Sequence, residues 1–486
     1  RPDYIGCMGG YVYLNASMIR LVGVRSPGMS AEMMDAAFLG DHPDVPPYIP
    51  QPGDEAPERE PAIEATMASF MTATEPPVEL AEDRAMILEI RDNRPDLATA
   101  TEAELVARAR SMTPVVRELF EPYYVYGTAS AVGPGILGEL CGGIDPSLPG
   151  RLISGLGGVD SAPPAQAIWD MSRMDPDSAE FADALAAFRH EHGARGPGEW
   201  DPANPSWEVD PSPVLVAIEA MRDADDELSP AARHARTVAD REAAEAEARA
   251  ALAGNDEALA TLDLGLRVSS IFVPARERTK LSEMMAVHEV RLPMYELGRR
   301  MVDRGVLDEA RDIFLLLDTE LDEFLADPHS FQASLAQRKT DFAALADLQD
   351  PFIINGEAPP LSEWKPRESV SDPVYVGEVL QGAPGSPGTV TGRARVVLDP
   401  GDARGLEQGE ILVAPVTDPA WTPLFVPASA VVVDVGAPLS HAVIVSREFG
   451  IPCVCSVHQA AQRIPDGALI TVDGGTGAVT VVELPA

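Results

Sequence analysis

The sequence predicts a multidomain protein in which a mostly α-helical domain is followed by a compact α/β domain. Its 486 residues exceed the roughly 250–300 that one hydrophobic core usually serves. From about residue 78 to 350, alanine, leucine, glutamate and arginine recur at the three- and four-residue spacing of amphipathic helices. After residue 388, short β-rich runs separated by turns indicate an α/β domain of about 100 residues.

The first sixty residues combine short regular elements with a proline-rich segment. Alternating apolar residues in GYVYLNASMIRLVG, residues 10–23, predict a strand or two leading into a helix. Residues 41–61 contain seven prolines, so we expect an extended loop there.

Three later segments carry the strongest helical pattern. Ser229 followed by Pro230 is a good helix start, because proline suits the first helical turn. Pro293 is expected to kink or interrupt its helix, because it lacks a backbone N–H group. The segments are residues 101–124, 230–254 and 280–305.

Proline and glycine in residues 366–388 predict a linker between two domains. The mostly helical domain then covers residues 1–365, and the α/β domain covers residues 389–486. The strands expected in the second domain lie in TVTGRARVVL, GEILVAP, SAVVVDVG, IPCVCSV, GALITVDGG and GAVTVVEL.

Charge and composition restrict the partners and the compartment. Acidic residues outnumber basic ones by 77 to 37, so we expect neither nucleic acid nor an anionic membrane as a partner. The sequence contains no run of about 18 apolar residues, so we predict no membrane span. The 4 cysteines are too few and too badly spaced for a disulfide framework or a zinc site, and we predict no metal site. These features fit a cytoplasmic protein.

The stretch GAPLSHAVIVSREFGIPCV, residues 436–454, holds the strongest candidate for chemistry. Ser440 is placed to cap a helix that starts at His441, and Gly450 to end it. N–H groups and the helix dipole stabilise an anion at that position, so a phosphoryl group on His441 would be held electrostatically. A neutral imidazole is also a competent nucleophile near pH 7. A surface histidine beside a helix cap would give the same pattern.

Residues 383–482 resemble the swivelling phosphohistidine domain of phosphoenolpyruvate synthase, pyruvate phosphate dikinase and rifampicin phosphotransferase. The resemblance is carried by SPGTVTGRARVV, ILVAPVTDPAWTPLF, VVVDVGAPLSHAVIVSREFGIPCV and DGALITVDGGTGAV. It implies that His441 is phosphorylated from ATP, with Ser440 in the signature around it. Ala437 and Pro438, in the loop that leads to the histidine, depart from the residues usual in that family.

The same resemblance assigns the preceding loop a place beside the histidine. In TDPAWTPLF, it implies that Asp418, Trp421 and Thr422 bind the phosphoryl group or the acceptor. Turn formation and packing would explain these three residues equally well.

The helical region resembles the acceptor-binding domain of the rifampicin phosphotransferase type. The resemblance rests on GYVYLNASMIR, SGLGGVDSAPPAQAIWDMS, HEHGARGPGEWDPANPSW and LGRRMVDRGVLDEARDIFLL. In HGARGPGEWD, His192 is a candidate base, and the guanidinium group of Arg195 is a candidate for binding phosphate. Glu199 and Asp201 are candidate acidic partners. Structural ion pairing would use the same residues.

A methionine-containing stretch supplies a further candidate for acceptor binding. Met284, Met285, His288 and Arg291 fall within two helical turns, so they would line an apolar pocket or form core.

The resemblance implies that the reaction is divided between two polypeptides. We find no glycine-rich phosphate loop followed by lysine, so ATP and Mg²⁺ are expected on a separate ATP-grasp subunit. The short stretch after His441 makes pyruvate a less expected acceptor than in phosphoenolpyruvate synthase. Two-subunit relatives, phenylphosphate synthase and alkylphenol-phosphorylating systems, imply a phenolic acceptor, with AMP and phosphate as the other products.

Two alternatives stay open. The chain would also fit the truncated body of a rifamycin-type antibiotic phosphotransferase, or a non-catalytic phosphohistidine regulatory protein. Two weaker signals are set aside: GPGILG, residues 133–138, lacks the context of a dinucleotide fold, and Cys453 and Cys455 suit core packing better than redox or metal chemistry.

Overall fold

The chain folds into two compact units, each assembled from two separate stretches. The computed structural model describes residues 5–8, 11–26, 29–39, 44–160, 162–366, 373–400, 406–437 and 440–485, without the side chains of 36–38. One unit comprises Arg1–Ala73 and Ala326–Ser371, and the other Thr74–Leu325 and Asp372–Ala486. Residues 1–365, predicted to be one domain, are therefore divided between the two units.

Contacts between distant residues hold the first unit together. The hydroxyls of Tyr11 and Tyr13 donate to the carbonyls of Leu345 and Pro351, which joins the N-terminal hairpin to the later stretch. The hairpin and the helix after it confirm the pattern predicted for residues 10–23. The elements are β1 (Ile5–Met8), β2 (Tyr11–Leu14), α1 (Ala16–Arg25), α2 (Ala31–Phe38), α3 (Glu60–Thr72), α13 (Gln332–Ala344), β3 (Leu348–Gln349) and β4 (Lys365–Pro366).

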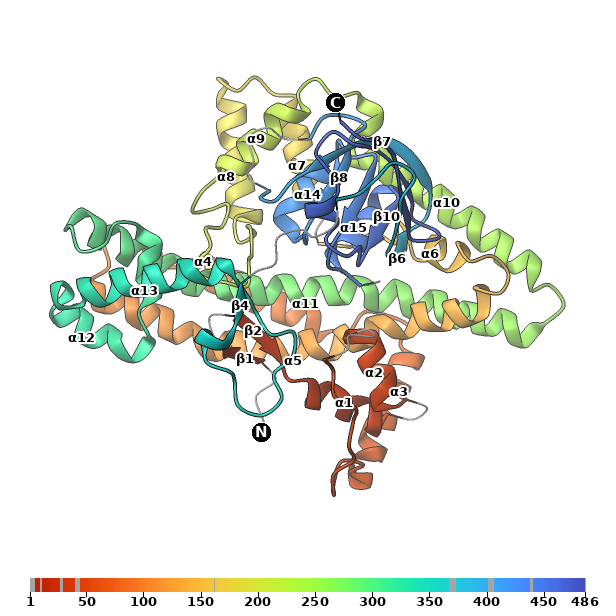
Figure 1. The fold of residues 1–486 in the computed structure, drawn as a ribbon, viewed down its shortest axis with the longest axis horizontal. Helices are drawn as coiled ribbons and strands as arrows, with labels where there is room; N and C mark the ends of the chain where they lie inside the picture. The colour runs from red at the N-terminus through yellow and green to blue at the C-terminus, as the bar shows by residue number, and fades with distance from the viewer. Residues whose placement is uncertain are drawn as a thin grey trace. The chain divides into compact units, whose positions relative to one another are not determined.

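Two long antiparallel helices form the frame of the second unit. In Figure 1, α11 (Asp256–Asp303) runs across the molecule, and it packs along α5 (Glu102–Cys141). The helices approach most closely at Gly133, where an added Cβ would lie only 2.4 Å from Ser269 Oγ. At such a distance only glycine fits without a shift of the backbone.

The helix boundaries confirm one sequence signal and correct another. Ser229 Oγ accepts a hydrogen bond from the N–H of Ala232 and caps α10 (Pro230–Ala251), as predicted. Pro293, however, does not interrupt its helix, because α11 continues to Asp303. Pro293 is buried, so packing of the helix outweighs the roughly 3 kcal/mol that a proline costs inside a helix.

Shorter helices surround this frame. Among the described helices, α11 alone has the length and apolar composition to cross a membrane, yet its buried residues include Glu277, Glu283, Glu289 and Arg291, which is typical of a helix in a protein interior. The other helices are α4 (Glu79–Asp92), α6 (Leu148–Leu152), α7 (Pro163–Ser172), α8 (Ala179–His192), α9 (Ser212–Met221) and α12 (Leu321–Ala326).

An eight-stranded mixed sheet forms the α/β part of the second unit. Its strand order is β5-β12-β11-β7-β8-β9-β10-β6, and the adjacent strands β7 to β10 run parallel. All six predicted strands are present. The elements are β5 (Val379–Gln381), β6 (Ala383–Ser386), β7 (Thr389–Val396), β8 (Ile411–Ala414), α14 (Thr422–Phe425), β9 (Ala430–Val433), α15 (His441–Phe449), β10 (Cys453–Cys455), α16 (Ala460–Arg463), β11 (Leu469–Asp473) and β12 (Ala478–Glu483).

The predicted linker, 366–388, is partly wrong. Residues 367–372 lie outside the described residues, but β5 and β6 occupy its second half and pair with β12 and β10. Backbone hydrogen bonds to strands far away in sequence order this segment, and its proline and glycine content could not indicate them.

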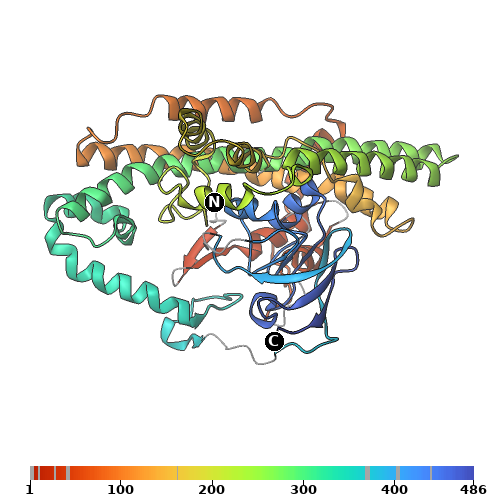
Figure 2. The same ribbon diagram turned by 90° about the horizontal axis from the view of Figure 1, so that it is seen from above.

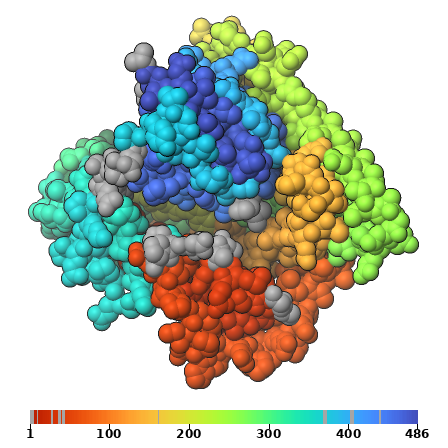
Figure 3. All heavy atoms as spheres, turned by 45° about the vertical axis from the view of Figure 1, so that its right-hand side comes forward, coloured from red at the N-terminus to blue at the C-terminus, as the bar shows by residue number. Residues whose placement is uncertain are grey.

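One hydrophobic cluster joins the sheet to the helices of the second unit. Trp169, Phe188 and Trp207 from the helical part belong to the same buried cluster as Phe425 and Phe449. The ribbon seen from above and the space-filling view place the blue α/β residues against the helices, with yellow-green α10 beside them (Figures 2 and 3). The α/β part is therefore docked on the helical part.

The close helix contact gives a matched pair of glycine variants. Gly133→Ala should lower the free energy of unfolding by about 1–3 kcal/mol, because its Cβ would collide with Ser269. Gly135→Ala, in the same helix with nothing within 4 Å of its Cβ, should instead raise it by up to about 1 kcal/mol through helix propensity. Urea denaturation measures both, and equal shifts in the two variants would contradict the close approach.

Candidate active site

His441 is the first residue of α15, and hydroxyl groups contact both nitrogens of its ring. Thr417 Oγ1 lies 3.1 Å from Nδ1, and Thr422 Oγ1 lies 3.1 Å from Nε2. The Phe425 ring packs edge-on against the imidazole, with the centroids 5.7 Å apart. In the neutral ring one threonine accepts from the protonated nitrogen, and the other donates to the nitrogen that carries the lone pair.

The first turn of α15 is not capped by a side chain. Ser440 occupies the N-cap position, but its side chain makes no capping hydrogen bond, and its buried Oγ has no partner among the described residues. The predicted capping role is therefore wrong, because the hydroxyl lies near Gly436, where an added Cβ would be 3.1 Å from it. Uncapped N–H groups at a helix start favour an anion. Gly450 ends the helix at φ 63°, as predicted.

Three cations from the helical part act on the imidazole. The pKa of His441 lies well below its usual value because the ring is desolvated and because Lys280, Arg195 and Arg276 repel the imidazolium. The ring is therefore neutral at physiological pH, which is the nucleophilic form. Arg276 and Lys280 lie four residues apart on α11 and so share one face of that helix.

Glu199 holds two of these cations in place. Its buried carboxylate lies 3.1 Å from Arg195 Nη1 and 2.9 Å from Lys280 Nζ. Burial alone would raise the pKa of Glu199, but the two cations hold it below its usual value, so the group stays ionised. A carboxylate paired in this way is a poor proton acceptor, and the geometry favours a positioning role over the predicted catalytic one.

The loop between β8 and α14 contacts the helical part. Asp418 Oδ2 accepts a hydrogen bond of 2.5 Å from the N–H of Gly198. Burial and the nearby carboxylate of Glu199 raise the pKa of Asp418 to about 6. Trp421 is buried in the core, so Thr422 is the only one of the three residues predicted in this loop that contacts the imidazole.

Arg291 and His288 hold the segment of the helical part that runs from Glu199 to Glu208. Arg291 Nη2 donates to the carbonyls of Glu199 at 2.8 Å and of Asp201 at 3.2 Å. His288 Nε2 lies 2.8 Å from Glu208 Oε2, and burial lowers the pKa of His288 to about 4. These contacts are structural, in line with the core alternative for the methionine-containing stretch.

His192 and Asp201 make local contacts. The His192 ring packs edge-on against Phe188, with the centroids 5.2 Å apart, and desolvation lowers its pKa. Asp201 is exposed, and its Oδ1 accepts from the N–H of Ala203 within a turn. Neither side chain contacts His441 among the described residues.

A second set of contacts docks the α/β part on α10 and on the segment after α6. Glu448 Oε1 accepts from the N–H of Leu156 at 3.2 Å, and its Oε2 lies 3.4 Å from His234 Nδ1. The Glu448 carboxylate raises the pKa of His234. Both Arg233 Nη atoms lie 3.3 Å from the carbonyl oxygen of Ala428. The docked position thus rests on a few polar contacts beside the shared hydrophobic cluster.

Sequence reasoning missed Thr417, Arg276 and Lys280. Thr417 adjoins the predicted Asp418 and gave no signal of its own. Lys280 is one of only three lysines in the chain and lies one turn after Arg276, a pattern that singles out a basic face on the helix.

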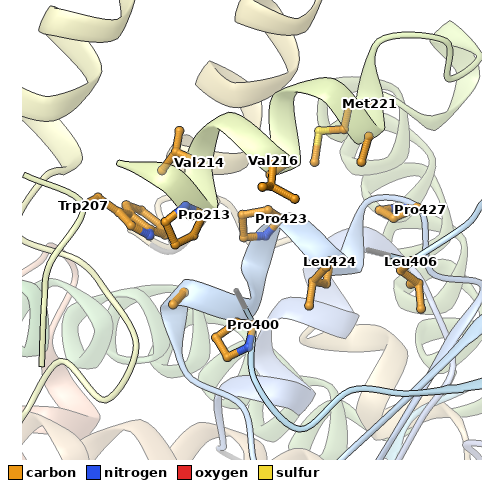
Figure 4. A pocket seen from close by; sticks show the side chains of 13 residues that line it. Trp207, Pro213, Val214, Val216, Met221, Pro400, Leu406, Pro423, Leu424 and Pro427 are labelled. Carbon is orange, nitrogen blue, oxygen red and sulfur yellow. The ribbon is translucent and has the colours of Figure 1, made fainter. Parts of the chain in front are cut away.

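The apolar pocket in Figure 4 lies away from the imidazole. It has a volume of ≈20 Å³, room for about one water molecule, and a wider cleft of ≈680 Å³ adjoins it. Figure 4 shows Val214 and Val216 of α9 opposite Pro423 and Leu424 of α14. His441 lines neither space, so this pocket belongs to the docking surface.

In the described part of the chain, Cys453 and Cys455 are buried, and the possible metal ligands are scattered. No group of three or more histidine, cysteine, aspartate or glutamate residues there is arranged to hold a metal ion. Burial raises the pKa of Cys453 to about 12 and also raises that of Cys455, so both stay unreactive thiols in the core.

Two family models match the chain. Residues 406–477 match the mobile domain of PEP-utilising enzymes, and residues 125–277 match the fourth domain of rifampicin phosphotransferase. The first region contains His441 and the second contains Arg195, Glu199 and Arg276. Both resemblances inferred from the sequence are thereby confirmed.

Several known proteins are similar to parts of the chain. Rifampicin phosphotransferase of Streptomyces sviceus is 31% identical over 318 residues, which is 63% of this chain and 35% of that protein. Prodigiosin synthesizing transferase PigC of Serratia marcescens is 30% identical over 322 residues, 65% of this chain and 35% of that protein. An uncharacterised protein of Mycobacterium tuberculosis is 39% identical over 209 residues, 43% of this chain and 23% of that protein. The chain therefore spans about a third or less of these relatives.

Glu283, one turn after Lys280, is a buried carboxyl group whose Oε2 has no hydrogen-bond partner among the described residues. Burial raises its pKa to about 8, from 4.5 for an ordinary glutamate. Between these pH values the folded protein holds a proton that the unfolded chain has lost. The free energy of unfolding therefore falls as pH rises from about 4.5 to about 8, and levels off above.

Glu283→Gln should remove this pH dependence, because the amide is neutral throughout. The variant should gain stability relative to the wild type between pH 5 and pH 8, by at most about 1.4 kcal/mol per pH unit. Chemical denaturation at both pH values measures the gain, with Glu257→Gln at the exposed start of α11 as the control. Parallel pH profiles for wild type and Glu283→Gln would contradict the shifted pKa.

Proposed function

We propose that this chain is the phosphohistidine-bearing part of an ATP-dependent phosphotransferase, because it matches domain models of PEP-utilising enzymes and of rifampicin phosphotransferase. His441 takes a phosphoryl group from ATP and passes it to a hydroxyl group of a small acceptor bound at the helical part. The observation that carries the proposal is the contact of Thr417 and Thr422 with the two ring nitrogens of His441, whose pKa is lowered by burial and by Lys280, Arg195 and Arg276. A carrier in this position faces cations that suit a phosphoryl group.

The proposed transfer is balanced without a further reactant. The acceptor oxygen attacks phosphorus, an O–P bond forms, and the N–P bond of phosphohistidine breaks. The electron pair of that bond returns to the ring nitrogen, which takes up the proton released by the hydroxyl group. Thr417 and Thr422 each contact one ring nitrogen. The threonine on the nitrogen that does not react would orient the ring.

We place ATP and Mg²⁺ on a separate ATP-grasp subunit, as the sequence predicts. There the β-phosphoryl group of ATP would pass to His441, its bond to AMP would break, and water would release the γ-phosphoryl group as phosphate. His441 would travel between the two sites when the α/β part leaves its docked position. The polar contacts of Asp418 and Glu448 are few enough to break and re-form. A cytoplasmic location stays a prediction from composition.

For the acceptor we propose a phenol or alkylphenol. A phenol has a pKa near ~10 and needs less help from a base than an alcohol does. This suits a site in which Glu199 is ion-paired with Arg195 and Lys280, and Glu277 with Arg276. The truncated antibiotic phosphotransferase and the regulatory phosphoprotein remain as alternatives, and acceptor turnover distinguishes them.

The first experiment is labelling of this chain with ATP carrying ³²P at its β-phosphate, alone and with the candidate ATP-grasp subunit. We expect acid-labile label only with the partner, and none in His441→Ala. Label that forms but never leaves in the presence of hydroxyl acceptors would favour the regulatory alternative. Label in His441→Ala equal to the wild type would disprove the proposal.

Lys280→Met tests the role of the cations. The variant should still be labelled by the partner, but phosphoryl transfer to the acceptor should slow by roughly 10²-fold, because one charge that stabilises the moving phosphoryl group is lost. Rapid-quench measurement of label discharge gives this rate. Lys365→Met, at an exposed lysine of the other unit, is the matched control. Unchanged discharge in folded Lys280→Met would exclude this role.

A further inference from the structure

We propose that Trp200 and Tyr123 form the platform that binds the ring of an aromatic acceptor. This inference rests on the proposed function and names residues that select the substrate of the same site. The two rings are in contact, with centroids 5.4 Å apart and planes at 53°. The Phe120 ring extends the group, with its centroid 6.1 Å from that of Tyr123.

Trp200 is exposed although it is one of the most apolar side chains. Its exposed fraction is 42%, and neither its indole N–H nor the Tyr123 hydroxyl makes a hydrogen bond within the described residues. An exposed indole in contact with a second ring offers an apolar face and a free donor to a ligand. Exposed aromatic residues of this kind are typical of binding sites.

The backbone around Trp200 is held rigidly. On either side of it, the carbonyls of Glu199 and Asp201 accept hydrogen bonds from Arg291. Two residues further, the carbonyl of Ala203 accepts from the Tyr295 hydroxyl at 2.6 Å. Because the loop is already ordered, a ligand that stacks on the indole loses little entropy in fixing it.

The platform adjoins the cations that act on His441. The side chain of Glu199, the residue before Trp200, binds Lys280 Nζ at 2.9 Å, and the N–H of Gly198 donates to Asp418 beside the histidine. One short loop therefore carries the indole, orients a cation and contacts the carrier domain.

The packing of the two long helices places Tyr123 in the same area. The Tyr126 ring stacks on Phe272, with centroids 6.1 Å apart, and Arg276 and Lys280 follow Phe272 at successive turns of α11. Since α5 runs antiparallel to α11, Tyr123 lies about one turn further toward Lys280. An aromatic ring on the platform would thus present its hydroxyl group to the cations and to the phosphoryl group on His441.

The test compares phenol with cyclohexanol, which has a similar size and a hydroxyl group but no π-system. Trp200→Ala and Tyr123→Ala should each raise the phenol concentration for half-maximal discharge of phosphohistidine about tenfold, while discharge to cyclohexanol changes less than twofold. Labelling by the ATP-grasp subunit should be unaffected, and Tyr375→Ala, at an exposed tyrosine of the α/β part, should behave as wild type. Equal loss with both acceptors, or no loss with either, would overturn the proposal.

Calorimetric titration of the unphosphorylated full chain with 4-nitrophenol gives a second readout that needs no phosphotransfer. Binding should weaken about tenfold in Trp200→Ala and recover most of its strength in Trp200→Phe. If His441 chemistry fails but this difference is found, the platform stands and the proposed function falls. If binding is the same in wild type and Trp200→Ala, the platform is excluded even where His441 is labelled and discharged.

Discussion

The buried carboxylate of Glu199 is the interaction on which the rest of the site depends. A buried charge is tolerated only when it is paired, and Glu199 is paired twice, with Arg195 and with Lys280. Those contacts fix two cations from different segments next to each other. The carbonyl of the same residue is bound by Arg291, so the loop that presents Gly198 to the α/β part is fixed as well. Removal of this carboxylate would leave two desolvated cations without the ion pairs that now hold them.

Docking brings this preformed cationic site to the histidine. His441 and its two threonines belong to the α/β part, whereas Arg195 and Lys280 belong to the helical part, so neither part contains a complete site. The hydrophobic cluster spans the two parts, and contacts such as Asp418 with Gly198 fix the orientation. Under the proposed function this combination suits a carrier that serves two sites, because an apolar surface is non-directional and the few hydrogen bonds set the orientation each time the α/β part docks.

Local features were predictable from the sequence, and long-range ones were not. The strands and the helix that begins at His441 follow from short-range alternation, capping residues and glycine, so their positions agree with the sequence. The strands β5 and β6 were missed because their partners lie about 70 to 100 residues away along the chain. The approach of Lys280 to His441 depends on docking of two parts, which no local pattern encodes. His288 looked like a ligand-binding residue, yet its pairing with Glu208 makes it structural.

The charges of the site affect how strongly the α/β part is held in its docked position. The cations that depress the pKa of His441 disfavour a second positive charge there, and the same cations favour a dianionic phosphoryl group. Under the proposed function, the docked position is therefore stabilised more for the phosphorylated carrier than for the free one. A difference of this kind is what shifts a two-state equilibrium, since a group acts on it only by interacting differently with the two states. Once the phosphoryl group has left, the neutral imidazole no longer attracts Lys280 and Arg276, and the remaining docking contacts must hold the carrier alone.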